Sequence, residues 1–238
     1  MELDDLRARE RDVRERVVEA ADRVDRDPGE VELLPVTKGH PPGVLRTVAA
    51  AGFERVGENR VGQAEDKFSK VGRLGLSWHM VGHLQLNKAR RAIQLFDELE
   101  SLDSLRLARK LNRELEKADG GDFDVLIQVN ASGEDSKSGF AATSPRSDAL
   151  LDQVRTVCSF PRLQVRGLMT MAPLTDDEEV LRTTFRRTRR AFERLGDEVE
   201  GFHARTLSMG MSNDYEIAVE EGATRLRLGT ALLGPRQR

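Results

Sequence analysis

The stretch VELLPVTKGHPPGVLRTVAAAGFERVGEN, residues 31–59, decides how the chain is expected to fold. Its first apolar run, residues 31–37, ends on Lys38, and a glycine, a histidine and two prolines follow. Residues 43–51 have the period of a helix, and a second apolar run over 53–57 leads into the end of the stretch. The stretch therefore predicts a strand, a helix and a second strand, which is the repeating unit of a parallel sheet.

The same alternation continues along the rest of the chain. Apolar runs predict strands near 31–37, 53–57, 77–82, 97–102, 123–130, 162–169, 204–209 and 225–229. Helix-period stretches separate them near 43–51, 60–72, 87–95, 103–117, 146–158, 177–196 and 213–221. Eight alternating units favour an α/β fold closed into a (β/α)8 barrel of the TIM type. An open doubly wound sheet is the alternative, but its G-x-G-x-x-G fingerprint after the first strand is missing.

A charged helix precedes the predicted barrel. Residues 2–27 carry a narrow apolar stripe at helical spacing, and Pro28-Gly29 is expected to end it. The last strand leaves no room for a final long helix, so we expect the helix of residues 1–28 to cover that part of the outer ring. Residues 1–238 are then expected to form a single barrel domain.

The composition argues against several classes of function. A net charge of −3 and a pI near 5.9 provide no basic surface for nucleic acid. Cys158 is the only cysteine, which excludes a disulfide framework and a cysteine-based metal site. The charged start has no apolar signal segment, and no apolar run approaches the roughly 18 residues of a membrane span. We therefore expect a cytoplasmic protein that binds neither nucleic acid nor membrane.

Polar side chains gather at the carboxyl ends of the predicted strands, where the active site of such a barrel lies. Lys38 ends the first strand, Asn59 follows the second, and Arg227 lies on the eighth. His79 and His83 lie at the end of the third strand, and their roles stay open. We expect no metal site there, because no cysteine or carboxylate joins the two histidines at ligand spacing.

The loops after the seventh and eighth strands offer a phosphate site. Ser208, Gly210 and Ser212 supply hydroxyl and backbone N–H groups after the seventh strand, and Gly229 and Thr230 supply the same groups after the eighth. A helix is expected immediately behind the first group, and a helix N-terminus favours a bound dianion without needing a lysine.

The same segment has a second interpretation, in which Asn213 caps the helix and Glu216 completes a capping box. The two interpretations are compatible, because caps and phosphate sites share one geometry. A phosphate site beside a strand-end lysine points to pyridoxal 5′-phosphate, whose aldehyde forms a Schiff base with lysine. Lys38 is the expected Schiff-base lysine, whereas Lys137 lies in a polar loop and is expected to be solvated.

Several motifs resemble those of one known family. They are LLPVTK, GENRV, WHMVGHLQLNK, NASGEDSKSG, RGLMTM and LSMGMSNDYEIAVEEGATRLRLGTALLG, and they extend over roughly residues 31–235. The chain resembles the pyridoxal phosphate homeostasis proteins, the proline-synthase co-transcribed or YggS-like group. Their single barrel is similar to the N-terminal domain of alanine racemase, so the resemblance implies the same fold here.

The resemblance also implies roles for individual residues. Lys38 would carry the Schiff base, Asn59 would lie beside the cofactor ring, and Arg227 would face the pyridine nitrogen. The residues implied to hold the phosphate are Ser208, Gly229 and Thr230. Threonine, glycine and histidine around Lys38 and glycine at position 62 depart from the commoner family residues, but none of these positions is assigned to the cofactor.

Two functions from different classes fit these residues: a pyridoxal phosphate carrier and an amino-acid racemase. A guanidinium only donates, so Arg227 should leave the ring nitrogen neutral and the ring a weak electron sink. A racemase also needs an acid or base on each face of the substrate carbon. Racemases of similar fold take a tyrosine for the second face from an additional domain, and the only tyrosine here, Tyr215, lies in the capping segment.

We therefore expect a storage or carrier protein for intracellular pyridoxal phosphate homeostasis, with no catalytic residue and no metal. The alternative is a pyridoxal-phosphate-dependent racemase or related enzyme with weak activity. Expected partners are apo-enzymes that receive the cofactor, and the expected assembly is a monomer or a weak dimer.

Overall fold

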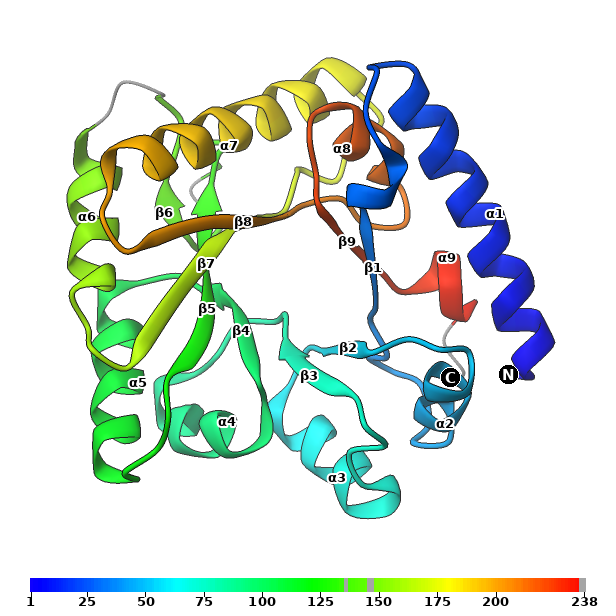
Figure 1. The fold of residues 1–238 in the computed structure, drawn as a ribbon, viewed down its shortest axis with the longest axis horizontal. Helices are drawn as coiled ribbons and strands as arrows, with labels where there is room; N and C mark the ends of the chain where they lie inside the picture. The colour runs from blue at the N-terminus through cyan, green and yellow to red at the C-terminus, as the bar shows by residue number, and fades with distance from the viewer. Residues whose placement is uncertain (135–136, 145–147, 236–238) are drawn as a thin grey trace.

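The structure is a computed structural model that describes residues 1–134, 137–144 and 148–235. Its strands form one sheet with parallel pairings in the order β1-β9-β8-β7-β5-β4-β3-β2, and the sheet curls into a barrel with helices outside it (Figure 1). The strands are β1 (Glu32–Pro35), β2 (Arg55–Glu58), β3 (Ser77–Met80), β4 (Glu98–Leu102), β5 (Phe123–Asn130), β6 (Phe140–Ala141), β7 (Leu163–Thr170), β8 (Phe202–Ser208) and β9 (Arg225–Leu228). The predicted barrel is confirmed, because β1 and β2 also meet.

Each of the eight predicted strands overlaps an observed strand, and β6 is the strand that was not predicted. It has two residues and lies beside the carboxyl end of β5, where Val129 and Asn130 pair with it. Two residues are too few to show a strand period in a sequence.

The barrel closes along a narrow seam between β1 and β2. Val36 forms an isolated parallel bridge with Gly57, and the Thr37 N–H donates to the Gly57 carbonyl at 3.0 Å. On its other side, β1 pairs with β9 along its whole length, from Glu32 to Pro35. We use "seam" for this short β1–β2 junction, which lies directly before Lys38.

The helices form an outer ring that α1 completes. The helices are α1 (Leu3–Asp22), α2 (Val44–Ala50), α3 (Val61–Val71), α4 (Ala89–Leu95), α5 (Leu105–Lys117), α6 (Asp148–Cys158), α7 (Glu178–Glu198), α8 (Tyr215–Glu220) and α9 (Thr230–Leu233), with short 3-10 turns at Pro28–Glu30 and Leu86–Lys88. The long α1 lies alongside α8 and the short α9, as predicted (Figure 1). No helix in the described ranges is long and apolar enough to cross a membrane.

The end of α1 differs from the prediction, which placed it at Pro28-Gly29. The helix ends at Asp22, and Asp25 has a φ of 54°, a left-handed conformation that a helix cannot continue. The guanidinium of Arg26 then donates to the carbonyl of Val219 at 2.5 Å. Docking on the end of α8 therefore ends the helix earlier than the apolar stripe suggested.

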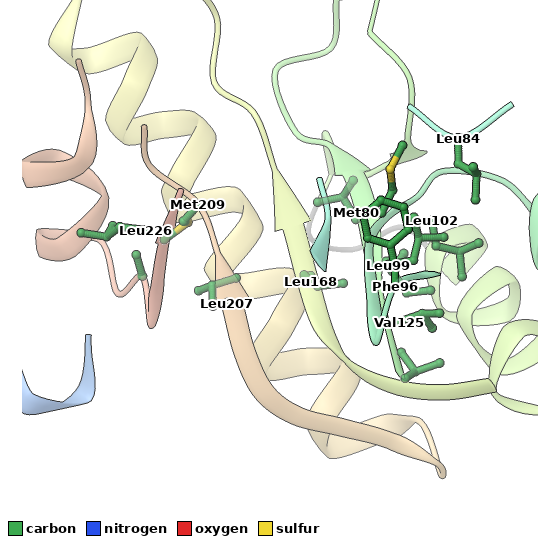
Figure 2. Close-up of a cluster of buried hydrophobic side chains, with 14 of the residues drawn as sticks. Met80, Leu84, Phe96, Leu99, Leu102, Val125, Leu168, Leu207, Met209 and Leu226 are labelled. Atoms are coloured by element: carbon green, nitrogen blue, oxygen red, sulfur yellow. The ribbon is translucent and has the colours of Figure 1, made fainter. Parts of the chain in front are cut away.

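The outer face of the barrel is apolar and packs against the helices. Leu207 of β8 and Phe185 of α7 belong to one large buried cluster, and both are almost fully shielded from solvent. Figure 2 shows part of this cluster, with side chains from β4, β5, β7, β8 and β9. Burial of this apolar surface is the main stabilising contribution to the barrel.

The barrel interior, in contrast, holds paired charges. Arg225 of β9 donates to Glu98 at 2.6 Å and to Glu100 at 3.0 Å, both on β4, and to Glu32 of β1 at 2.8 Å. His79 of β3 lies 3.1 Å from the same Glu100 carboxylate. Because β8, β7 and β5 separate β9 from β4 in the sheet, the contacts of Arg225 with Glu98 and Glu100 cross the barrel, whereas its contact with Glu32 joins neighbouring strands. Buried charges persist in a fold only when they are paired in this way.

The two carboxylates respond differently to this environment. Burial by itself would raise the pKa of Glu100, but the charge of Arg225 and the hydrogen bond with His79 lower that pKa to about 2. Burial raises the pKa of Glu98 from its ordinary value, although the charges of His79 and Arg225 oppose that shift. Glu100 is therefore the carboxylate that stays ionised and stabilises the folded barrel.

We predict that Glu100→Gln lowers the free energy of unfolding at pH 7 by about 3 kcal/mol, because Arg225 and His79 lose a buried partner. The pKa of Glu100 is lowered on folding, so its contribution is complete above pH 4.5 and is lost as the pH falls toward 2. Urea unfolding at pH 7 and pH 3 should show a smaller loss of stability in the variant than in the wild type. Identical losses in the two proteins would contradict the prediction.

Candidate functional site

A pocket of about 470 Å³ opens at the carboxyl ends of the barrel strands. Five of the six residues expected to contact the cofactor line it: Lys38, Asn59, Arg227, Gly229 and Thr230. They follow or belong to β1, β2 and β9, which lie next to one another around the closed barrel. The structure therefore brings together residues from both ends of the sequence, as the barrel prediction required.

Arg227 forms the floor of this pocket and is held firmly. Its guanidinium donates to the carbonyl and the hydroxyl of Ser208, both at 2.8 Å, and to the carbonyl of Thr170 at 2.7 Å. Burial lowers the pKa of Arg227, and the charges of Glu100 and Asp214 oppose this shift. A guanidinium remains protonated in such surroundings, so Arg227 presents a fixed donor to the pocket.

Ser208 has different partners from those expected. Its hydroxyl donates to Glu100 at 2.6 Å and accepts from Arg227, and the residue is fully buried and does not line the pocket. A hydroxyl has one hydrogen to donate, and here a carboxylate receives it. Ser208 therefore joins the interior charges to Arg227, and its expected contact with the phosphate stays a prediction.

Ser212, which the sequence also indicated as a hydroxyl donor after the seventh predicted strand, lies at the pocket. It lines the pocket with Gly229 and Thr230, and its hydroxyl oxygen accepts the backbone N–H of Ala231 at 3.1 Å. That bond leaves the hydroxyl hydrogen of Ser212 available for donation. Two hydroxyls and the backbone at the start of α9 thus converge on one corner of the pocket.

The capping box expected at Asn213 and Glu216 is not formed. The helix α8 begins at Tyr215, and no side chain caps its first turn. Asp214 instead accepts the backbone N–H of Met211 at 2.5 Å, which closes a turn between Ser212 and the helix. Burial raises the pKa of Asp214, while this hydrogen bond opposes the shift.

Asn59 lies against Gly82, the glycine of the HMVGHLQ segment. A Cβ built on Gly82 would lie 2.3 Å from the Asn59 carbonyl oxygen and 2.6 Å from the Asn59 side-chain carbon. Contacts this short exclude any side chain at position 82 without movement of Asn59. The glycine therefore gives Asn59 its place at the pocket wall.

His79 and His83 each contact a carboxylate. The expectation that no carboxylate joins the histidines is wrong for His79, whose ligand atom lies within 4.8 Å of those of Glu98 and Glu100. The guanidinium of Arg225 already pairs with both carboxylates. His83 contacts Asp103 at 2.8 Å outside this network.

Lys137 is not simply solvated. Its amine pairs with Glu134 at 2.6 Å and donates to the carbonyl of Met171, which lines the pocket, at 3.3 Å. The expected solvated loop lysine is therefore an ion-paired residue near the rim of the site.

Sequence reasoning missed the residues that support the site. In the strand ELESL, Glu98 and Glu100 alternate with leucines, and this alternation was a signal for charges on the inner face. Lys67 shares the buried face of α3 with Val61 and Ala64, where an apolar residue is usual. Arg225, the partner of Glu98 and Glu100, lies on a strand far away in the sequence, so that pairing had no local signal; Lys67 pairs with Glu58 on the preceding strand.

Comparisons with known proteins agree on one family. Residues 10–237 match the family model described as alanine racemase, N-terminal domain. The pyridoxal phosphate homeostasis protein of Escherichia coli K12 is 39% identical over 228 residues, which cover 94% of each chain.

Two solved structures extend this agreement to the fold. PipY of Synechococcus elongatus PCC7942, solved with pyridoxal phosphate bound, is 34% identical, has a TM-score of 0.78, and the match covers 93% of this chain and 100% of PipY. Alanine racemase of Clostridium difficile 630 matches with a TM-score of 0.72 at 13% identity, over 99% of this chain and 57% of the racemase, which shows a shared fold. The chain therefore belongs to the alanine racemase N-terminal domain family and, within it, to the pyridoxal phosphate homeostasis proteins.

Proposed function

We propose that this protein binds pyridoxal 5′-phosphate in the pocket at the barrel mouth and holds it through Lys38 as a cofactor carrier. The observation that carries the proposal is the meeting of Lys38, the fixed guanidinium of Arg227 and the polar corner at Gly229 and Thr230 in one pocket. The relatives named as pyridoxal phosphate homeostasis proteins and the cofactor bound to PipY support it.

The donor set fits the three polar parts of this cofactor. The phosphate matches the corner formed by Ser212, Gly229 and Thr230, where the first N–H groups of α9 have no intrahelical acceptor. The aldehyde matches the amine of Lys38, and the pyridine nitrogen matches a donor such as Arg227. Asn59 on the neighbouring strand would line one side of the ring.

Lys38 would supply the covalent bond. Lys38 would hold the cofactor through its Nζ, because the cofactor would supply an aldehyde that condenses with a neutral amine to a C=N bond, with the oxygen lost as water together with the two amine hydrogens. This condensation reverses when water returns. A carrier needs such reversibility, because its cargo has to leave intact.

Arg227 argues for a carrier over an enzyme. Its guanidinium is fully buried and keeps its protons, so it can only donate to the pyridine nitrogen. The ring nitrogen then stays neutral and withdraws few electrons from a bound amino acid. When bound, the cofactor supplies an electron-withdrawing ring, and a neutral ring nitrogen makes that ring less electrophilic.

The position of the tyrosine agrees with the carrier function. Tyr215 is buried near Arg16 of α1 and does not line the pocket. A racemase requires a second acid or base on the face opposite the lysine, and Tyr215 does not supply it. Recipient apo-enzymes, a monomeric or weakly dimeric assembly and a cytoplasmic location remain our predictions.

We predict that Lys38→Ala abolishes the Schiff-base absorbance of the protein mixed with pyridoxal phosphate and leaves the fold intact, because a half-buried strand-end amine contributes little packing. Absorbance, borohydride trapping with peptide mapping, and circular dichroism measure the three properties. Trapping of a different lysine, for example Lys137, in the wild-type protein would overturn the assignment.

We predict that Thr230→Val weakens binding of pyridoxal phosphate about tenfold and leaves the Schiff base in place, since one hydrogen bond to a charged phosphate is lost. Fluorescence titration with pyridoxal phosphate and with pyridoxal measures the effect. Affinity for pyridoxal, which has no phosphate, should not change. An equal loss for both ligands would place Thr230 outside the phosphate site.

We predict that the loaded protein shows no substantial turnover of L- or D-alanine or serine and transfers its cofactor to an apo-transaminase. The neutral ring nitrogen and the position of Tyr215 outside the pocket disfavour turnover, and the reversible bond to Lys38 permits transfer. A chiral amino-acid assay and a reactivation assay measure the two activities. Racemisation at about 1 s⁻¹ or faster that Lys38→Ala abolishes would establish the racemase instead.

A further inference from the structure

We propose that Lys67 and Glu58 are positioning residues that fix the backbone beside Lys38 and thereby favour formation of its Schiff base. The inference rests on the proposed function, because it concerns the bond between Lys38 and the cofactor. Both residues lie at the seam, where the barrel closes through very few backbone contacts immediately before Lys38.

A buried polar cluster spans this seam. The amine of Lys67 on α3 lies 2.5 Å from Glu58 Oε1 on β2, 2.6 Å from the Thr37 carbonyl and 3.1 Å from the Thr37 hydroxyl. The Thr37 hydroxyl also donates to Glu58. Lys67 is 4% exposed, and Glu58 and Thr37 are fully buried, so water does not compete for these bonds.

The ammonium of Lys67 uses all of its donors in this cluster. It carries three N–H groups, and it has three acceptors, of which two belong to Thr37. The carbonyl of Thr37 belongs to the peptide group that leads into Lys38. Gly39 follows with a φ of 78°, so Lys38 lies between a fixed carbonyl and a tight left-handed turn.

The cluster acts on both sides of the pocket. Thr37 directly precedes Lys38, and Glu58 directly precedes Asn59, and both of these following residues line the pocket. Lys67 joins the two preceding residues, so it sets the separation between β1 and β2 at the mouth. A lysine that must meet an aldehyde carbon gains from such fixed placement, because bond formation is sensitive to small displacements.

A purely structural role explains the cluster less well. Replacing a buried ion pair by apolar residues of similar volume is often neutral or stabilising, so stability alone gives little reason to keep one. In addition, Glu58 Oε2 has no hydrogen-bond partner among the described residues, although it is buried. An ion pair with an unsatisfied oxygen is a costly way to hold a strand and a helix together.

The test compares two ligands across four proteins. The proteins are the wild type, Lys67→Met, the double variant Glu58→Leu/Lys67→Met, and Lys70→Met. Lys70 lies on the same helix and pairs with Asp66 at the surface, so it is the matched control. The ligands are pyridoxal 5′-phosphate and pyridoxamine 5′-phosphate, which has the same ring and phosphate and no aldehyde. Absorbance with borohydride trapping measures the Schiff base, fluorescence measures both affinities, and thermal unfolding measures stability.

We expect Lys67→Met to weaken binding of pyridoxal phosphate about tenfold or more, with less protein trapped by borohydride, and to change pyridoxamine phosphate binding much less. The double variant should show the same selective loss at near wild-type stability, because it leaves no unpaired buried charge. If Lys67→Met does not fold, the double variant by itself tests the inference. Lys70→Met should behave as the wild type.

Three results would overturn the inference. Equal losses for both ligands would make Lys67 a structural residue of the pocket. Wild-type Schiff-base formation in the double variant would show that the cluster does not position Lys38, while the proposed function would stand. Absence of a Schiff base in the wild type would remove the proposed function and the inference together.

Discussion

The contact between Arg225 and the carboxylates of Glu98 and Glu100 is the interaction on which the rest of the structure depends. It crosses the barrel from β9 to β4, and it allows charged side chains to fill an interior that leucine or valine could have filled. The free-energy cost of burying each charge is offset by its charged partners. Removing one partner therefore leaves a buried charge unpaired and destabilises the fold. The free energy gained by burying apolar side chains on the outer face of the barrel offsets this cost.

The network connects this interior to the site. Glu100 accepts a hydrogen bond from the Ser208 hydroxyl, which in turn accepts one from Arg227. The interior network therefore fixes the orientation of the Arg227 guanidinium. The backbone before Lys38 is fixed by other contacts, namely the seam and the hydrogen bonds of Lys67 to Thr37. The two groups that would meet the aldehyde and the ring nitrogen are therefore held by independent supports.

The comparison with alanine racemase shows how little the fold decides about activity. The barrel is shared at 13% identity, and the chain covers 57% of the racemase. The chemistry of a bound cofactor is set by the side chains around it, here a donor-only arginine at the floor. Asn59, packed against Gly82, lines one side of the pocket, and Tyr215 is not among the described lining residues. The groups at the site, and not the barrel itself, therefore decide the activity of a protein with this fold.

The sequence by itself determined the order of elements, because strand and helix periods are local properties of the chain. It also predicted that Lys38, Asn59 and Arg227 share one mouth of the barrel, because each lies at or near the carboxyl end of an apolar run, and all three line the pocket there. Ser208 is the last residue of β8 and Ser212 follows it in the next turn, and only the direction of each side chain decides that Ser212 lines the pocket and Ser208 does not. The direction of each side chain depends on how β8 packs within the barrel.

Only the tertiary structure decided which charges meet. Glu100 and Arg225 are far apart in the chain, and their pairing follows from closure of the sheet, which no local period encodes. The early end of α1 likewise depends on the docking of Arg26 at α8. Propensity and periodicity describe a few neighbouring residues, whereas the partners of a buried charge are chosen by the geometry of the whole barrel.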